Sequence, residues 1–241
     1  MKESVKRAQY LSGMRSAVPV ILGFVPVGIA YAIMARQAGF SIGETCAMSV
    51  TVFAGASQMM AVGMYAQGAG VIAMILATFI LNLRHLIMSV CVMNRMHRAS
   101  LKARLLAAFG VTDESFALFT TEKEEKCTAA YFLGLITVTY SSWIAGSFIG
   151  AVASDFLPPI LTASLGIALY AMFIGILTPG VSKNLRLGLL VLLTAVCNSI
   201  LMQFMPSSWA LIASTLICAL AGVFFVDLEP EKKGESADGK R

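Results

Sequence analysis

Long apolar runs dominate this chain and limit what it can fold into. Seven of them follow one another with polar stretches between, at residues 16–35, 45–66, 70–92, 129–152, 161–177, 187–204 and 209–226. Each is close to the ~20 residues that an α-helix needs to cross a bilayer. Only 13% of the residues are charged, about half the share found in soluble domains. The pattern predicts an all-α polytopic membrane protein with about six to seven transmembrane segments.

The polar stretches suggest how the chain is divided. We expect a cytoplasmic N-terminal segment at 1–15, a single transmembrane domain at 16–226 with a cytoplasmic loop at 93–126, and a flexible C-terminal tail at 227–241. The first apolar run contains Pro26 and is too long for the hydrophobic part of a signal peptide. It therefore predicts a retained first helix, kinked at that proline. Within the loop, residues 101–110 are typical of a short amphipathic helix, and residues 111–126 of a charged loop.

Basic residues cluster at four places, and cytoplasmic loops of membrane proteins are rich in Lys and Arg. The clusters lie at the N-terminus, at 95–104, at 183–186 and in the tail. If every run crossed the membrane, the second cluster would lie opposite the N-terminus, so one of the first three runs should fail to cross. The second run, interrupted at Gly55, is the best candidate for a re-entrant or broken pair of half-helices, with both chain ends in the cytoplasm. The alternative is seven crossings with the N-terminus outside.

The charge and the cysteines exclude other classes of protein. The net charge of +5 comes from residues between apolar runs, so topology in a lipid bilayer explains it and no nucleic-acid partner is expected. A metal cluster or a disulfide framework needs close, patterned cysteine spacing. The chain has no CxxC pair, so we expect no metal site and no cofactor. We expect the cysteines to pack as small apolar side chains: Cys46, Cys91, Cys127, Cys197 and Cys218.

The second run carries the main candidate for a binding site. Residues 53–58 combine small residues with a hydroxyl and an amide, and irregular polar backbone at membrane depth must line a cavity or pack against protein. Unwinding near Gly55 would free backbone N–H groups that suit a carboxylate. Ser57 and Gln58 would be the side-chain partners of that carboxylate.

Two further pairs of residues complete this predicted binding site. Phe53 and Met59 would receive an apolar side chain of the ligand, although ordinary packing explains either one alone. Freed carbonyl groups near Pro26 and Gly28 of the first run would suit an ammonium group, although these residues could simply shape a kink.

A second candidate group joins the third run to the loop. Asn82, Arg84 and His85 lie near the end of that run, where Arg can reach the interface and His can cap a helix. Alternatively, Arg84 pairs with Asp113 or Glu114 as a cytoplasmic gate, and His85 carries a proton because its ordinary pKa is ~6.5. The acidic pair could equally be solvated. The sequence leaves both interpretations open.

Several motifs recur in an order that is typical of one transporter family. They are Pro19, Gly23 and 26–28; Ser49 with 52–58; 82–85; 112–117; Trp143 with Gly146 and Gly150; and the turn at 155–156. In order and spacing, over essentially the whole chain, these motifs resemble the AzlC family of branched-chain amino acid permeases. The spacing of Gly146 and Gly150 also predicts close helix packing, and it offers a tight interface to a partner subunit.

The resemblance implies a secondary transporter of the bacterial inner membrane that exports branched-chain and similar apolar amino acids. It implies that the chain is the large subunit of a two-component permease with a small hydrophobic AzlD-type partner. Coupling to protons would fit a titratable residue such as His85 on the pathway.

Other functions remain as alternatives. An enzyme is not expected, because intramembrane proteolysis would need Ser57 or a similar serine with His85 as base, and no nucleophile motif, HExxH or catalytic aspartate pair occurs. An amino-acid-permeable channel shares a polar, broken-helix lining with a carrier, and saturable counter-flow separates the two. A structural membrane subunit without its own transport activity would tolerate changes at Ser57 and Gln58.

Overall fold

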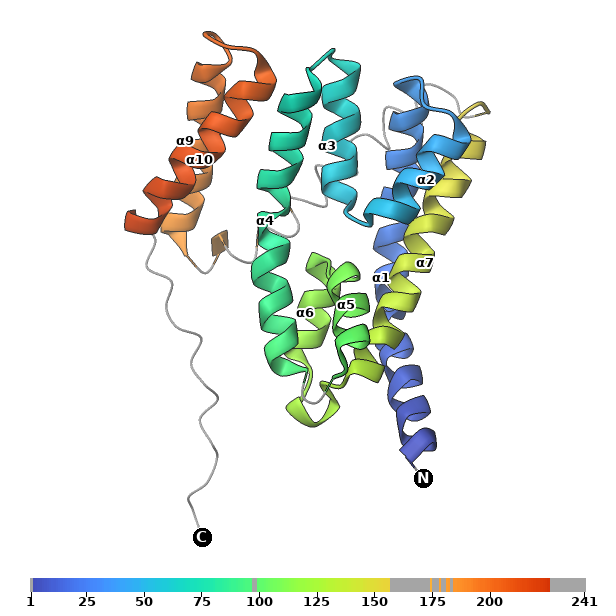
Figure 1. Cartoon of the computed structure of the whole chain (residues 1–241). Coiled ribbons are helices and arrows are strands. Elements are labelled where there is room, and N and C mark those ends of the chain that lie inside the picture. The colour runs from blue at the N-terminus through green and yellow to red at the C-terminus, as the bar shows by residue number, and fades with distance from the viewer. Residues whose placement is uncertain are drawn as a thin grey trace. The chain divides into compact units, whose positions relative to one another are not determined.

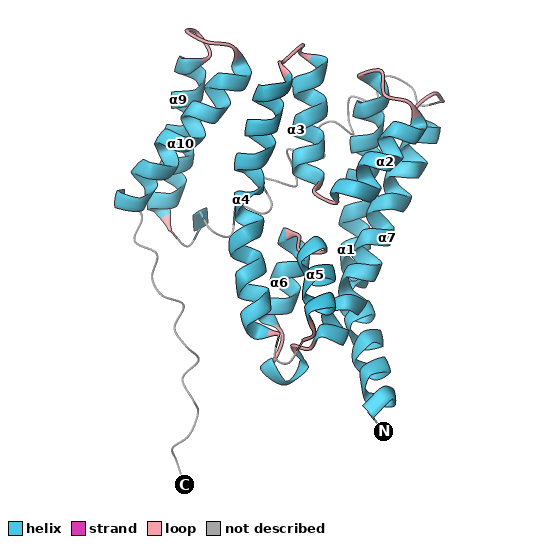
Figure 2. Ribbon diagram, viewed as in Figure 1, coloured by secondary structure: helices cyan, strands magenta, loops and turns pink. Residues whose placement is uncertain are grey.

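The computed structural model describes residues 2–96, 99–156, 174, 178, 181–182 and 184–225, and every regular element in that part of the chain is a helix (Figure 2). The chain forms two compact units, Met1–Phe173 and Ile174–Arg241. The first unit contains α1 (Lys2–Gln37), α2 (Ile42–Val52), α3 (Gly55–Ala66), α4 (Val71–Arg95), α5 (Leu101–Phe109), α6 (Asp113–Thr121), the 3-10 turn η1 (Glu124–Lys126) and α7 (Ala129–Ala153). The second contains α9 (Leu185–Leu201) and α10 (Ser207–Phe225).

Three of the described helices are long and apolar enough to cross a membrane: Ser4–Gln37 within α1, α4 and α7. In the second unit, α9 and α10 are shorter apolar helices that pack on each other, and Ser214 Oγ donates a hydrogen bond to Asn198 Oδ1 (3.3 Å). The prediction of an all-α polytopic membrane protein is therefore confirmed. The predicted run at 161–177 lies almost wholly outside the described residues, as does the tail at 227–241, so the number of crossings stays a prediction.

The second apolar run is broken where the sequence predicted. Helix α2 ends at Val52 and α3 begins at Gly55, because the backbone leaves the helical region at Phe53 and Ala54. The two half-length helices return the chain to the end of the unit where α1 finished, and α4 then runs back the other way (Figure 1). As the charge pattern required, the first two basic clusters lie at the same end of this unit. Their cytoplasmic location stays a prediction.

The expectation of a charged loop at 111–126 is wrong, because residues 113–121 form α6. Thr112 and Ser115 cap its first turn reciprocally, with each side-chain oxygen accepting a hydrogen bond from the other residue's backbone N–H (3.2 and 2.8 Å). Phe119 is fully buried against α7, at a ring-centroid distance of 4.9 Å from Phe132. The charged residues at the two ends of α6 made the segment resemble a loop, so its buried face was not predicted from the sequence.

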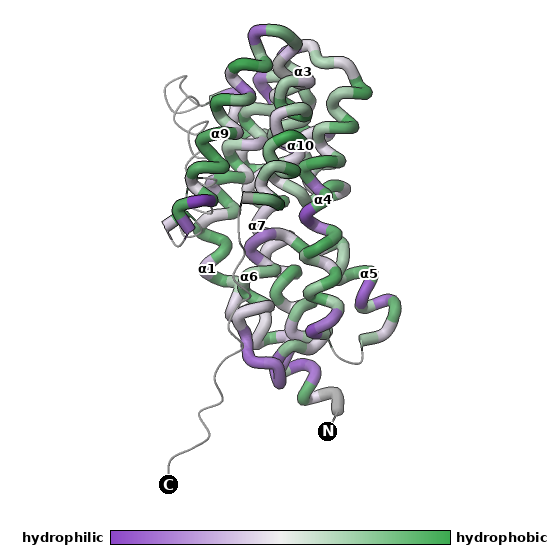
Figure 3. Tube along the Cα trace, turned by 90° about the vertical axis from the view of Figure 1, so that its left-hand side faces the viewer, coloured by the Kyte–Doolittle hydropathy of each residue, from purple (hydrophilic) through white to green (hydrophobic). Residues whose placement is uncertain are grey.

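Helices α1 to α3 and α4 to α6 repeat one arrangement in opposite directions. In each set a long helix is followed by a half-length pair that enters the unit and turns back near its middle (Figure 1). The pairs enter from opposite ends, and their tips meet, with the rings of Phe53 and Phe109 6.3 Å apart. Figure 3 shows hydrophilic residues gathered at the N-terminal end of the unit, whereas the long helices are mostly apolar. Two opposed half-helix pairs are typical of transporters with inverted repeats.

Helices α1 and α7 run parallel and form the frame of the unit. A Cβ atom at Gly146 or Gly150 would lie 2.7 or 2.6 Å from the carbonyl oxygen of Val25 or Ile29, so only glycine allows this approach. The predicted close packing is therefore confirmed. The suggestion that this face receives a partner subunit is wrong, because α1 of the same chain covers it.

Helix α1 begins at Lys2 and is continuous through Pro26, so the residues expected as a separate N-terminal segment extend the first helix. Gln9 and Tyr10 in this extension contact α7 through hydrogen bonds with Thr128 (3.1 Å) and Thr137 (2.9 Å). At the other end, Arg36 forms an ion pair with Asp155 (3.0 Å) just after α7. The two helices are therefore joined along their whole shared length.

Candidate functional site

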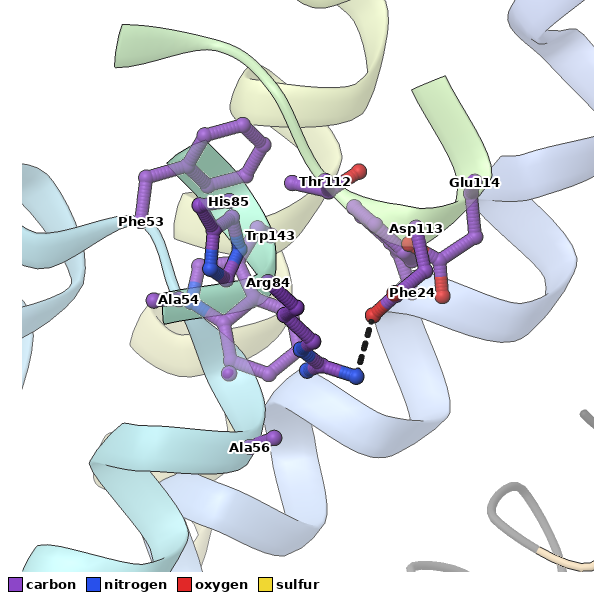
Figure 4. A pocket seen from close by; sticks show the side chains of 11 residues that line it. Phe24, Phe53, Ala54, Ala56, Arg84, His85, Thr112, Asp113, Glu114 and Trp143 are labelled. Carbon is purple, nitrogen blue, oxygen red and sulfur yellow. Dashed lines mark ion pairs between the residues drawn. The ribbon is translucent and has the colours of Figure 1, made fainter. Parts of the chain in front are cut away.

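A small cavity lies where the tips of the two half-length pairs meet. Its volume is about 40 Å³, which at ~10–15 Å³ per water holds about three waters. The lining comes from α1, the two tips, α4 and α7 (Figure 4), and consists of Phe24, Phe53, Ala54, Gly55, Ala56, Arg84, His85, Thr112, Asp113, Glu114 and Trp143. The cavity would therefore have to widen to hold a molecule of ordinary metabolite size.

The N-terminus of α3 opens onto this cavity without a cap. Within the described residues, no side chain accepts a hydrogen bond at its N-cap, Ala54. The first backbone N–H groups of a helix have no partner inside the helix and carry a partial positive charge. A Cβ at Gly55 would lie 2.5 Å from the ring of Trp143, so glycine is needed for α3 to begin here.

Phe53 holds the tip of α2 and α3 in an unusual conformation. Its φ of 25° and ψ of 49° lie near the left-handed region, which a bulky residue rarely adopts. Such a conformation costs of the order of 1–3 kcal/mol and persists only where the surroundings enforce it. Here the ring is 3% exposed and packs between residues of α1, α5 and α7. The site thus contains a strained turn held by aromatic packing.

The N-terminus of α6 faces the same cavity with the opposite chemistry. Thr112 caps it, and its first turn carries the carboxylates of Asp113 and Glu114, which compensate the helix dipole from within the chain. Both carboxylates line the cavity and are partly buried. One tip therefore presents uncompensated N–H groups, and the other presents negative charge.

Arg84 of α4 lies between the two tips and forms an ion pair with Asp113, with 3.0 Å between Nη1 and Oδ2 (Figure 4). The side chains are 33% and 29% exposed, so the pair is only partly shielded from water. The sequence suggested this pairing, and its use as a gate stays a prediction. His85 also lines the cavity, beside Phe53 (Figure 4).

Four buried polar atoms of α4 lack a hydrogen-bond partner within the described part of the chain: Asn82 Oδ1, Arg84 Nε, His85 Nδ1 and Arg95 Nε. Buried polar atoms in native structures are nearly always paired with protein or water. Two of these four atoms, on Arg84 and His85, belong to residues that line the cavity, so the site has spare hydrogen-bonding capacity for a ligand or for water.

Gln58 has a different role from the one that the sequence suggested. It is fully buried, its Nε2 donates to Ser49 Oγ (3.2 Å), and its Oε1 accepts from Trp143 Nε1 (3.0 Å). Ser49 in turn donates to Ser147 Oγ (2.7 Å). This network ties α2, α3 and α7 together behind the tip, so Gln58 positions the cavity wall and does not line it.

Most of the other predicted site residues lie at the cavity or directly behind it. Phe53, Gly55, Arg84, His85, Asp113 and Glu114 line the cavity together. Ser57 lies just behind it, donating to the carbonyl of Ala54 (2.9 Å) and accepting from Asn82 Nδ2 (3.1 Å).

Three predicted residues lie away from the cavity. Pro26 is on the exposed side of α1, Gly28 packs against the backbone of α7, and Met59 is buried in the apolar core. Five lining residues were not singled out as site residues from the sequence, namely Phe24, Ala54, Ala56, Thr112 and Trp143, although Ala54 and Ala56 lie within the candidate stretch 53–58. Among the described residues, no three His, Cys, Asp or Glu side chains gather as metal ligands would.

Comparison with known proteins gives one family match. Residues 19–157 match the family model described as AzlC protein. This region includes both half-length pairs, the cavity and α7. No solved structure matches the chain significantly.

Three relatives are similar over most of their length. An uncharacterized membrane protein of Archaeoglobus fulgidus is 31% identical over 72% of this chain and 77% of its own. The inner membrane protein YgaZ of Escherichia coli is 29% identical over 70% of this chain and 72% of its own. The branched-chain amino acid transport protein AzlC of Bacillus subtilis is 29% identical over 70% of this chain and 68% of its own.

Proposed function

Because the chain belongs to the AzlC family, we propose that it is a secondary transporter that moves branched-chain and similar apolar amino acids across the bacterial inner membrane. A relative named as a branched-chain amino acid transport protein supports the substrate class. We further propose that the direction of transport is export. We also propose that both chain ends are cytoplasmic, because the positions of the basic clusters favour this orientation.

The opposed polarity of the two tips carries the proposal. A free amino acid is a zwitterion, so its site needs a positive and a negative partner a few ångströms apart. The uncapped N-terminus of α3 and Arg84 suit its carboxylate, whereas Asp113 and Glu114 at the N-terminus of α6 suit its ammonium group. Phe24, Phe53 and Trp143 provide an apolar wall for the side chain.

The narrow cavity suggests how binding and gating are linked. In the structure Arg84 already holds one carboxylate, that of Asp113. An incoming substrate carboxylate would take the place of Asp113 on Arg84 and leave Asp113 to meet the substrate ammonium group. The exchange replaces one ion pair by two, so separating the tips costs less with substrate than without it. Such a difference is what a carrier needs, and a channel does not need it.

Proton coupling and the partner subunit are further parts of the proposal. His85 and Glu114 line the cavity and can each bind a proton near the substrate. The partner is a small hydrophobic AzlD-type membrane subunit. Co-expression should raise both yield and transport, and full activity of the single purified chain would contradict this dependence.

The decisive experiment is counter-flow in proteoliposomes that contain the chain with its partner. Vesicles loaded with unlabelled leucine should accumulate labelled leucine transiently and saturably, and an imposed pH gradient should change the rate. Lysine and glutamate, which carry an extra charge, should neither drive counter-flow nor compete. Non-saturating flux without counter-flow would instead favour the channel, and absence of flux in every arm would favour a structural subunit.

A further inference from the structure

One side chain, Phe53, joins the two tips to the frame of the unit. Its ring lies 6.3 Å from Phe24 of α1, 6.3 Å from Phe109 of α5 and 5.0 Å from Tyr140 of α7, measured between centroids. Phe109 and Tyr140 are themselves 5.6 Å apart, and the Tyr140 hydroxyl donates to the carbonyl of Val50 in α2 (2.7 Å). Movement of either tip must therefore displace this ring.

Phe53 also separates two cavities of different character. On one side is the small polar cavity of about 40 Å³. On the other side a cavity of about 320 Å³ lies between α5 and α7, with a mainly apolar lining that includes Leu106, Phe109, Ile136 and Tyr140. Phe53 contributes to both linings. Without the Phe53 ring, the small polar cavity would join the larger apolar one.

We infer that Phe53 determines which amino acids the transporter accepts, because its ring is the wall against which the substrate side chain ends. The inference rests on the proposed function. A substrate held by its carboxylate near Arg84 and the α3 N-terminus must place its side chain on the apolar side of the cavity, where Phe53 stands. With the ring in place, the widened cavity has room for a short branched side chain only. A shortened side chain at position 53 extends the site toward Ile136 and admits an aromatic substrate.

The conformation of Phe53 supports this role. No side chain of the described residues caps α3, and packing of the Phe53 ring helps to hold the tip backbone away from its preferred angles. A wall residue in such a turn can shift when the tip opens. Purely structural aromatic residues of this unit, such as Phe119 and Phe132, lie in regular helices and line neither cavity.

The test is substrate competition in proteoliposomes that hold the full chain and its partner. Uptake of labelled leucine is inhibited with unlabelled leucine, valine, phenylalanine or tryptophan, and the ratio of half-inhibitory concentrations is measured. Pocket contacts of one or more methylene groups discriminate by about tenfold or more. Phe53→Ala should therefore shift the phenylalanine-to-leucine ratio at least about tenfold toward phenylalanine. Phe53→Leu, which keeps more of the packing, should shift the ratio in the same direction by less.

Phe109→Ala is the matched control. Phe109 contacts Phe53 and lines only the larger cavity, so this change enlarges that cavity without opening the wall, and the ratio should stay as in the parent chain. The inference is overturned if Phe53→Leu still transports leucine and has the same phenylalanine-to-leucine ratio of half-inhibitory concentrations as the parent chain. This result would hold even if Phe53→Ala fails to fold. Absence of amino acid transport by the parent chain would count against the proposed function instead.

Discussion

The two tips that meet in the first unit have the same shape and opposite chemistry. At the α2–α3 tip, α3 begins with Gly55 and Ala56, has no side-chain cap, and is supported from behind by the buried Gln58 network. At the α5–α6 tip, α6 is capped by Thr112 and carries two carboxylates on its first turn. The contrast shows that one architecture, used twice, can present opposite charges to one small space. An amino acid, which carries both charges, is a ligand that such a space suits.

Removing Arg84 should have the largest effect on transport, because this residue lies between the two tips of opposite charge. Arg84→Ala leaves Asp113 unpaired and deprives the substrate carboxylate of its cation. Loss of one partner of a charge pair costs 2–5 kcal/mol when the pair is buried, and this pair is partly exposed, so we expect about a 30- to 100-fold loss of transport efficiency. Initial rates of leucine counter-flow measure it.

The double variant Arg84→Ala with Asp113→Ala separates the two roles of Arg84. If the two residues only neutralise each other, the double variant should regain most of the lost transport. Continued impairment at normal membrane abundance is the result that our assignment of Arg84 and Asp113 to the substrate requires.

Placing a carboxylate at the bare tip should make the two tips alike. Ala56→Asp puts an acid on the first turn of α3, where it favours the helix by about 0.3–1 kcal/mol but repels a substrate carboxylate. We expect the half-saturating leucine concentration to rise about 10- to 100-fold, which corresponds to losing 1.5–3 kcal/mol of charged hydrogen bonding. Thermal stability should be unchanged or slightly higher. Ala56→Asn, of the same shape without the charge, is the control, and an equal loss in both variants would contradict an electrostatic cause.

Disrupting the network behind the α3 tip should affect stability more than binding. Gln58→Leu leaves Trp143 Nε1 without its acceptor, at about 1–3 kcal/mol for the unsatisfied group, and removes the donor to Ser49 Oγ, which keeps its bond to Ser147. The sequence-based interpretation, in which Gln58 binds the substrate carboxylate, would instead give normal abundance and weaker affinity. The structure leads us to expect a lower melting temperature and lower membrane abundance with a near-normal half-saturating concentration. Thermal unfolding and transport of the same preparation decide between them.

The smallest effect is expected at the cap of α6. Thr112→Ala removes half of the reciprocal cap and should cost about 1 kcal/mol, seen as a modest loss of thermal stability. Thr112→Ser keeps the hydroxyl and should behave like the parent chain. A change in substrate selectivity with Thr112→Ser would mean that this residue contacts the substrate directly.

The broken second run could be predicted because Gly55 with small neighbours is a local signal, and the opposing charge clusters demanded a segment that turns back. The direction of each side chain could not be predicted. Successive residues of an α-helix are separated by about 100°, so Ala56 and Gln58 point to roughly opposite sides of α3. Only the register that begins at Gly55 shows that Ala56 faces the cavity and Gln58 faces α7.

The second tip was missed for a different physical reason. Between 111 and 126 the acidic and basic residues outweigh the apolar ones, which is typical of a loop. The local signals for a helix were Thr112 and Ser115 at capping distance and Phe116 and Phe119 three positions apart. Their burial depends on α4 and α7, which are far away in the sequence. Hence the ion pair of Arg84 could be suggested, but the opposed half-helix pairs could not.

The parallel pairing of α1 with α7 has a consequence for how the protein is made. Gln9 and Thr128, and Tyr10 and Thr137, bond across 119 and 127 positions. At about 5–20 residues per second of synthesis, α1 waits roughly 6–25 s before α7 emerges. During that interval the glycine-lined seam has no partner from its own chain, and such long-range closure is intrinsically slow. A nascent chain that ends before Ala129 therefore contains only one of the two frame helices. At this stage insertion factors, proteases and the rate of translation determine how much protein matures.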